Sequence, residues 1–167
     1  MNKLTLNLYR TRGVLPNVMI NGKLVKMKKV KKATYYQTVK EIDSDKAKIE
    51  IFRFQEINSR LWFLMYFLYF IISVGGIFDI PFNKKPLTIQ SIYEVDLTED
   101  CIVNISMEND IKNNVATKIV TDLTYRQGIN ACSLDLKAKK RIKIYRILKV
   151  LTWIAGIITG VVLLIVL

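Results

Sequence analysis

The residue types that carry most enzyme chemistry are scarce in this chain of 167 residues. It contains no histidine, which is the commonest general base and metal ligand in proteins. The P-loop and the G-x-S-x-G nucleophile motif are absent as well. Several carboxylates stand where turns are expected, a placement that favours turn formation over acid–base catalysis: Asp43, Asp45, Glu99, Asp100, Glu108 and Asp110. We therefore expect a protein that is not an enzyme, with no metal site and no cofactor.

The two cysteines, Cys101 and Cys132, allow two interpretations. They could close a disulfide if their part of the chain is extracellular. Alternatively, they are small apolar residues buried in strands, which we favour. The sequence Asn104-Ile105-Ser106 matches a glycosylation sequon, which has meaning only in a secretory lumen.

Positive charge is the strongest compositional signal. Lys and Arg number 26 against 14 Asp and Glu, so the net charge is +12. Such a balance suits an anionic membrane surface or a nucleic acid. No recognition-helix or RNA-binding signature accompanies the charge, so we expect anionic lipids as partners and no nucleic acid. The segment 23–32, KLVKMKKVKK, is either a basic strand on the membrane surface or a solvated sheet edge.

Two apolar runs show where the chain meets a membrane. They cover residues 61–78 and 150–167, and each has 18 residues with no charge. A helix of that length spans roughly 27 Å, close to the hydrocarbon thickness of a bilayer. Residue 61 lies too far along the chain for a secretory signal. We expect two membrane helices.

Outside these runs, alternating apolar and polar residues predict short β-strands. Leu4, Leu6 and Leu8 alternate with polar residues, and residues 87–97 and 115–125 repeat this pattern. Asn21-Gly22 predicts a tight hairpin turn. We also expect a hairpin between strands at 35–42 and 47–54, and a turn at Gln127-Gly128.

These patterns predict a membrane-anchored α+β protein in which two small antiparallel β lobes are each followed by one apolar membrane helix. The predicted boundaries follow chain order: a basic β-rich lobe at 1–60, a membrane helix at 61–78, a β-rich lobe at 79–136, a basic juxtamembrane helix at 137–149 and a second membrane helix at 150–167.

The basic helix is expected to hold lipid headgroups. Four side chains recur at roughly helical spacing and predict one basic stripe, whose long stems can reach phosphate level: Lys139, Lys143, Arg146 and Lys149.

The second apolar run carries small residues four positions apart, at Thr152, Gly156 and Gly160. Such spacing produces a flat face that lets another helix approach closely. Its partner could be the first apolar run, a second copy of the chain or another subunit.

The positive-inside rule gives conflicting answers for the two runs. Lys46, Lys48, Arg53 and Arg60 precede the first run and favour a cytoplasmic N-terminus. Seven basic residues between 137 and 149 precede the second run and favour a cytoplasmic second lobe. Both can hold only if the first run re-enters the membrane without crossing it. We expect the simpler arrangement, with two crossings and the N-terminal lobe in the cytoplasm.

These features favour a non-enzymatic integral membrane subunit, placed in the cell membrane. It would dock partner proteins within a larger membrane assembly, such as a secretion or export machine, or associate with itself. The alternative is a small immunity-type or membrane-perturbing protein that acts at the bilayer.

Overall fold

The computed structural model describes residues 2–11, 15–53, 60–72 and 86–166. The chain divides into two compact units. The first, called the sandwich here, contains Met1–Phe54 and Leu87–Ser133. The second, called the helical unit, contains Gln55–Pro86 and Leu134–Leu167.

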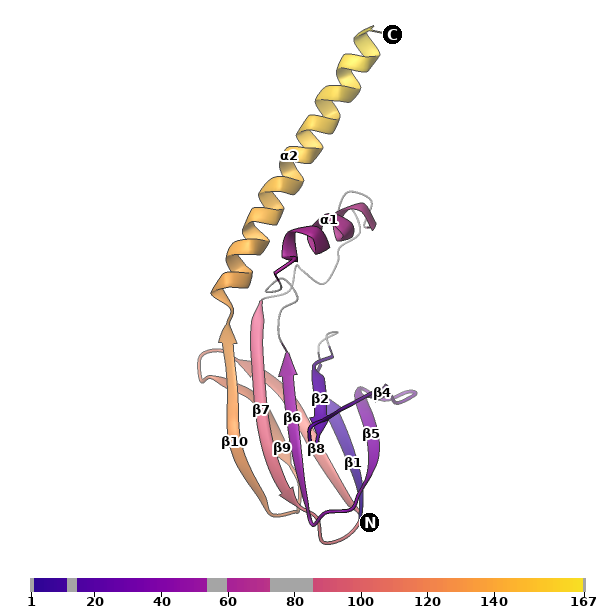
Figure 1. The fold of residues 1–167 in the computed structure, drawn as a ribbon, viewed down its shortest axis with the longest axis vertical. Helices are drawn as coiled ribbons and strands as arrows, with labels where there is room; N and C mark the ends of the chain where they lie inside the picture. The colour runs from indigo at the N-terminus through magenta and orange to yellow at the C-terminus, as the bar shows by residue number, and fades with distance from the viewer. Residues whose placement is uncertain (1, 12–14, 54–59, 73–85, 167) are drawn as a thin grey trace. The chain divides into compact units, whose positions relative to one another are not determined.

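Two five-stranded sheets make up the sandwich (Figure 1). The first sheet has the order β4 (Lys28–Lys29), β5 (Tyr35–Ile42), β1 (Asn2–Tyr9), β8 (Cys101–Asp110) and β9 (Val115–Val120). The second has the order β10 (Tyr125–Leu134), β7 (Leu87–Asp96), β6 (Lys46–Arg53), β2 (Asn17–Ile20) and β3 (Lys23–Val25).

The alternating residues form the core, as their period of two predicts. Leu4, Leu6 and Leu8 are fully buried on the inner face of β1. Tyr93 on β7 is buried from the opposite sheet, and its hydroxyl lies 2.8 Å from the Thr117 hydroxyl on β9. This bond links the two sheets and satisfies polar groups that would otherwise be costly to bury.

The prediction of two separate β lobes is wrong, because each sheet takes strands from both blocks of sequence. β1 pairs in parallel with β8, with Leu6 opposite Val103. β6 pairs antiparallel with β7, with Lys46 opposite Asp96. A block near 60 residues buries little apolar surface alone, whereas the combined strands close one core. Both blocks of sequence therefore contribute strands to one sandwich.

The hairpin turn predicted from the sequence at Asn21-Gly22 is confirmed, and two other local predictions are wrong. Asn21 and Gly22 have φ angles of 49° and 74°, and they connect β2 to β3 as predicted. The expected hairpin of residues 35–42 with 47–54 is wrong, because β5 and β6 belong to different sheets. Gln127 and Gly128 lie within β10, so the turn expected there is wrong as well.

The helical unit contains two described helices, α1 (Trp62–Ile72) and α2 (Leu136–Val166). The basic helix and the second membrane helix expected from the sequence are one continuous helix, α2. It is the one helix among the described residues that is long and apolar enough to cross a membrane. α1 has 11 residues, or about 16 Å, and residues 73–78 of the first apolar run lie outside the described residues.

Candidate membrane-anchoring site

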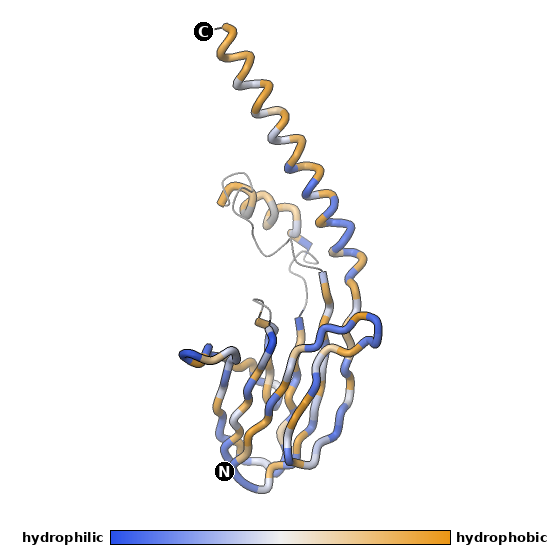
Figure 2. Tube along the Cα trace, turned by 180° about the vertical axis from the view of Figure 1, so that it is seen from behind, coloured by the Kyte–Doolittle hydropathy of each residue, from blue (hydrophilic) through white to orange (hydrophobic). Residues whose placement is uncertain are grey.

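Helix α2 changes character along its length. Residues 137–149 hold seven Lys or Arg, and residues 150–166 hold no charged residue (Figure 2). The apolar part spans about 25 Å, which approaches the thickness of a hydrocarbon layer. Its side chains are not buried by the part of the protein that the structure describes. An apolar surface of this kind is stable in lipid and unfavourable in water.

Asp135 fixes the point where α2 begins. Its Oδ1 accepts a hydrogen bond of 2.9 Å from the Ala138 amide, which is the usual geometry of a helix N-cap. Its own amide donates to the Pro86 carbonyl at 2.8 Å. The residue therefore starts the helix and also joins it to the chain segment that returns into β7.

A small cluster holds α1 against α2. Ala138 and Ile142 are buried, and Trp62 and Tyr145 pack on them. The Arg141 guanidinium carbon lies 5.0 Å from the centre of the Trp62 ring, within range of a cation–π interaction. This contact anchors the first turn of α1 on the basic part of α2.

Next to this cluster, the two helices enclose a groove of about 190 Å³. It is apolar on both sides and has one cationic residue. The lining residues are Trp62, Phe63, Phe67, Phe70, Tyr145, Leu148, Lys149 and Thr152. The groove lies where α2 changes from basic to apolar.

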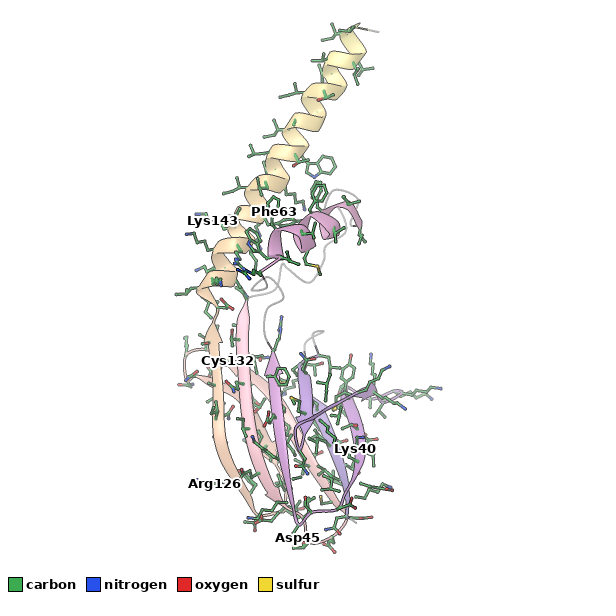
Figure 3. All side chains as sticks on the ribbon, in the orientation of Figure 1. Lys40, Asp45, Phe63, Arg126, Cys132 and Lys143 are labelled. Carbon is green, nitrogen blue, oxygen red and sulfur yellow. The ribbon has the colours of Figure 1, made fainter. Side chains whose placement is uncertain are left out.

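The four predicted headgroup residues do not share one exposed stripe. Lys139, Lys143 and Arg146 are exposed, and Lys143 projects from the side of α2 away from α1 (Figure 3). Lys149 is half-buried and lines the groove. Successive residues of a helix are about 100° apart around its axis, which places Lys149 on the side of α2 that packs on α1. The basic residues thus surround the helix, and whether they bind lipid stays a prediction.

The predicted small-residue face continues the surface that α1 uses. The Thr152 hydroxyl donates to the Leu148 carbonyl at 2.9 Å, and the residue lines the groove. At Gly156 and Gly160, an added Cβ would meet no neighbouring atom within 4 Å among the described residues. The face is open there, so its role in helix packing stays a prediction.

The thiols of the sandwich are poorly placed for chemistry. Cys101 and Cys132 are both buried and unpaired with each other. Burial is the main factor that raises the pKa of each thiol, and neighbouring carboxylates raise it further. Since the thiolate is the reactive form, both cysteines should react slowly with thiol reagents.

The carboxylates at turns act on the backbone. Asp110 accepts hydrogen bonds from the amides of Lys112 and Asn113 and from the Asn113 side chain. The bonds from Asn113 are the main factor that lowers the pKa of this carboxyl. Within the described ranges, no three His, Cys, Asp or Glu side chains come together as metal ligands do.

The sequon asparagine also has a structural partner. Asn104 accepts from the Asn7 side chain at 2.9 Å, and Asn7 accepts from Gln37 at 2.9 Å. These bonds form a polar ladder across β8, β1 and β5.

Sequence reasoning missed the contact between Trp62 and Arg141, which are far apart in the chain. The available signal was a tryptophan at the start of an apolar run together with a basic segment before the next one. Comparison with protein-family models, with curated proteins and with solved structures found no match to this chain.

Proposed function

We propose that this chain is a non-enzymatic membrane subunit, anchored by α2, whose sandwich docks partner proteins on the cytoplasmic side of the cell membrane. One observation carries this proposal. Strands before and after the first apolar run share both sheets, so their basic flanks lie on one side of the bilayer.

The shared sheets remove the conflict between the answers that the positive-inside rule gives for the two apolar runs. The basic residues that flank the first run and those that precede residue 150 now belong to one side of the membrane. The rule then gives a single answer, with the sandwich and the basic part of α2 in the cytoplasm.

In this arrangement α1 lies in the interface without crossing. Its described part has 11 residues, and most of the described apolar side chains are exposed. Phe63, Phe67 and Ile71 are each more than half exposed. The headgroup–acyl boundary accommodates such a helix and favours its aromatic rings.

Docking is assigned to the edges of the sheets. β10 forms one edge of its sheet, has ten residues, and is exposed over residues 125–129. An edge strand presents unpaired backbone groups that can bind a strand of another protein. Membership in a larger assembly, such as a secretion or export machine, would use this edge together with the open face of α2.

Cysteine labelling in intact cells tests the topology. Lys31→Cys and Lys112→Cys place exposed thiols in turns from the two blocks of sequence. A membrane-impermeant reagent should label neither variant in intact cells and both after permeabilisation. The unmodified chain is the control for background, since its two cysteines are buried.

Two results would contradict the proposal. Labelling of Lys112→Cys alone from outside would restore two crossings, and labelling of both from outside would reverse the orientation. Purification in mild detergent tests docking separately: co-purifying subunits are expected, and a lone monomer would favour the immunity-type or membrane-perturbing alternative.

A further inference from the structure

The sandwich has two ends, and its strand registers show which turns lie at each. At the exit end, β6 ends at Arg53, β7 begins at Leu87 and β10 ends at Leu134. At the far end, Asn2 donates from its side chain to the Leu97 carbonyl at 2.9 Å, and Leu97 donates to the Asp45 carbonyl at 2.7 Å. These bonds show that the two sheets have their far ends together.

The far end is acidic. Three of the turns at this end cover residues 43–45, 97–100 and 121–124, which connect β5 to β6, β7 to β8 and β9 to β10. None of these turns contains Lys or Arg. Their charged residues are Asp43, Asp45, Glu99, Asp100 and Asp122, and Figure 3 shows Asp45 at this end.

The exit end is basic. β4 pairs with the start of β5, Lys29 opposite Tyr36, so the turn at residues 30–34 projects here. The loop that begins at Arg10 and the turn at residues 111–114 lie at the same end. Among the described residues of these three connections there is no Asp or Glu. The basic residues of β4 and the connections are Arg10, Lys28, Lys29, Lys31, Lys32 and Lys112.

Nearby carboxylates do not reverse this charge. Glu108 lies on β8 next to this end, and its carboxylate is 3.4 Å from the Arg10 guanidinium. Asp110 binds the amides of its own turn. The lysines of β4 and of the 30–34 turn are exposed and carry no ion pair within the part of the chain that the structure describes.

The basic end is also the end from which the chain leaves for the membrane. Only Asp135 separates β10 from α2, and the first basic residue of the helix, Lys137, follows two positions later. The basic part of α2 therefore follows the exit end of the sandwich directly in sequence.

We propose that the exit end of the sandwich is a binding surface for anionic phospholipid headgroups, which turns the acidic far end away from the membrane. The inference rests on the proposed anchoring by α2. Anionic headgroups attract Lys and Arg and repel carboxylates, so the charge separation favours one orientation over its reverse. The attraction acts within a Debye length of about 8 Å at physiological salt, so the surface attracts headgroups only at close range.

Fluorescence transfer in lipid nanodiscs tests this orientation with the full chain. A donor dye is attached at Thr34→Cys, an exposed residue of the exit end, or at Thr98→Cys, an exposed residue of the far end. The acceptor is a dye-labelled headgroup. We expect transfer from Thr34→Cys to be higher in discs of phosphatidylcholine with phosphatidylglycerol than in phosphatidylcholine alone. High salt should abolish the difference, and Thr98→Cys should show none.

Matched charge variants identify the residues. Replacing Lys28, Lys31 and Lys32 by Gln should remove the response of the Thr34→Cys donor. Replacing Lys3, Lys40 and Arg126 by Gln removes the same charge from exposed residues elsewhere and should leave the response intact. Equal transfer in both lipids, an equal response from Thr98→Cys, or equal effects of the two triple variants would overturn the inference.

Different results would contradict the anchoring by α2 and the orientation of the sandwich. If sodium carbonate extracts the protein from membranes, the anchoring by α2 is wrong. If the protein resists extraction but the Thr34→Cys donor does not respond, only the lipid-binding surface is wrong.

Discussion

The sandwich and the helical unit use the same apolar residue types in opposite ways. Among the described residues, the buried apolar side chains lie in the sandwich, with Ala138 and Ile142 as the exceptions. In the helical unit, residues 150–166 of α2 are apolar and lie open. The sandwich therefore encloses its own core, whereas residues 150–166 of α2 present an apolar surface that lipid would accommodate.

The largest difference between the units should appear on removing an aliphatic side chain. Leu6 is fully buried, so Leu6→Ala should lower the free energy of unfolding of the sandwich by about 2–5 kcal/mol. Ile157 on α2 is 62% exposed, so Ile157→Ala should change it by less than about 0.5 kcal/mol. Urea unfolding of the full chain in mild detergent, followed by the circular dichroism of its sheets, measures both. Equal losses of unfolding free energy from the two substitutions would contradict this difference between the units.

A smaller difference is expected between the substitutions of two neighbouring aromatic residues of α1. Trp62 packs on Ala138 and Ile142 with Arg141 over its ring, and Phe63 is 59% exposed. Trp62→Ala should loosen α1 from α2 by about 1–2 kcal/mol, a 5- to 30-fold faster exchange of its amide hydrogens. Phe63→Ala should leave exchange nearly unchanged. If Phe63→Ala has the larger effect, the packing described for this cluster is wrong.

How far the sequence predicts the structure differs between the two units. In the sandwich, alternation located β1 and β7 correctly, because inward and outward side chains follow the pleat. It could not show that β1 pairs with β8, because alternation identifies the buried face of a strand and not its neighbour. For the same reason, the strands at β5 and β6 were predicted correctly and their hairpin was not.

In the helical unit, composition predicted α2, because charge and hydropathy separate along one continuous helix. The groove position of Lys149 follows from helical geometry once α1 is placed, but the sequence does not place α1. The contact between Trp62 and Arg141 joins segments on either side of four strands. Only the closure of the shared sheets brings those segments near each other.

The pairing of β6 with β7 across the first apolar run is the central claim, and a disulfide tests it most directly. Lys46 and Asp96 lie opposite each other, come from the two blocks of sequence, and form an exposed ion pair of 3.6 Å. In the full chain, Lys46→Cys with Asp96→Cys should form an intramolecular disulfide under mild oxidation, since paired strand positions have suitable geometry. Lys46→Cys with Lys112→Cys, at opposite ends of the sandwich, should not. A disulfide in neither pair, or in both equally, would contradict the shared sandwich and the one-sided topology built on it.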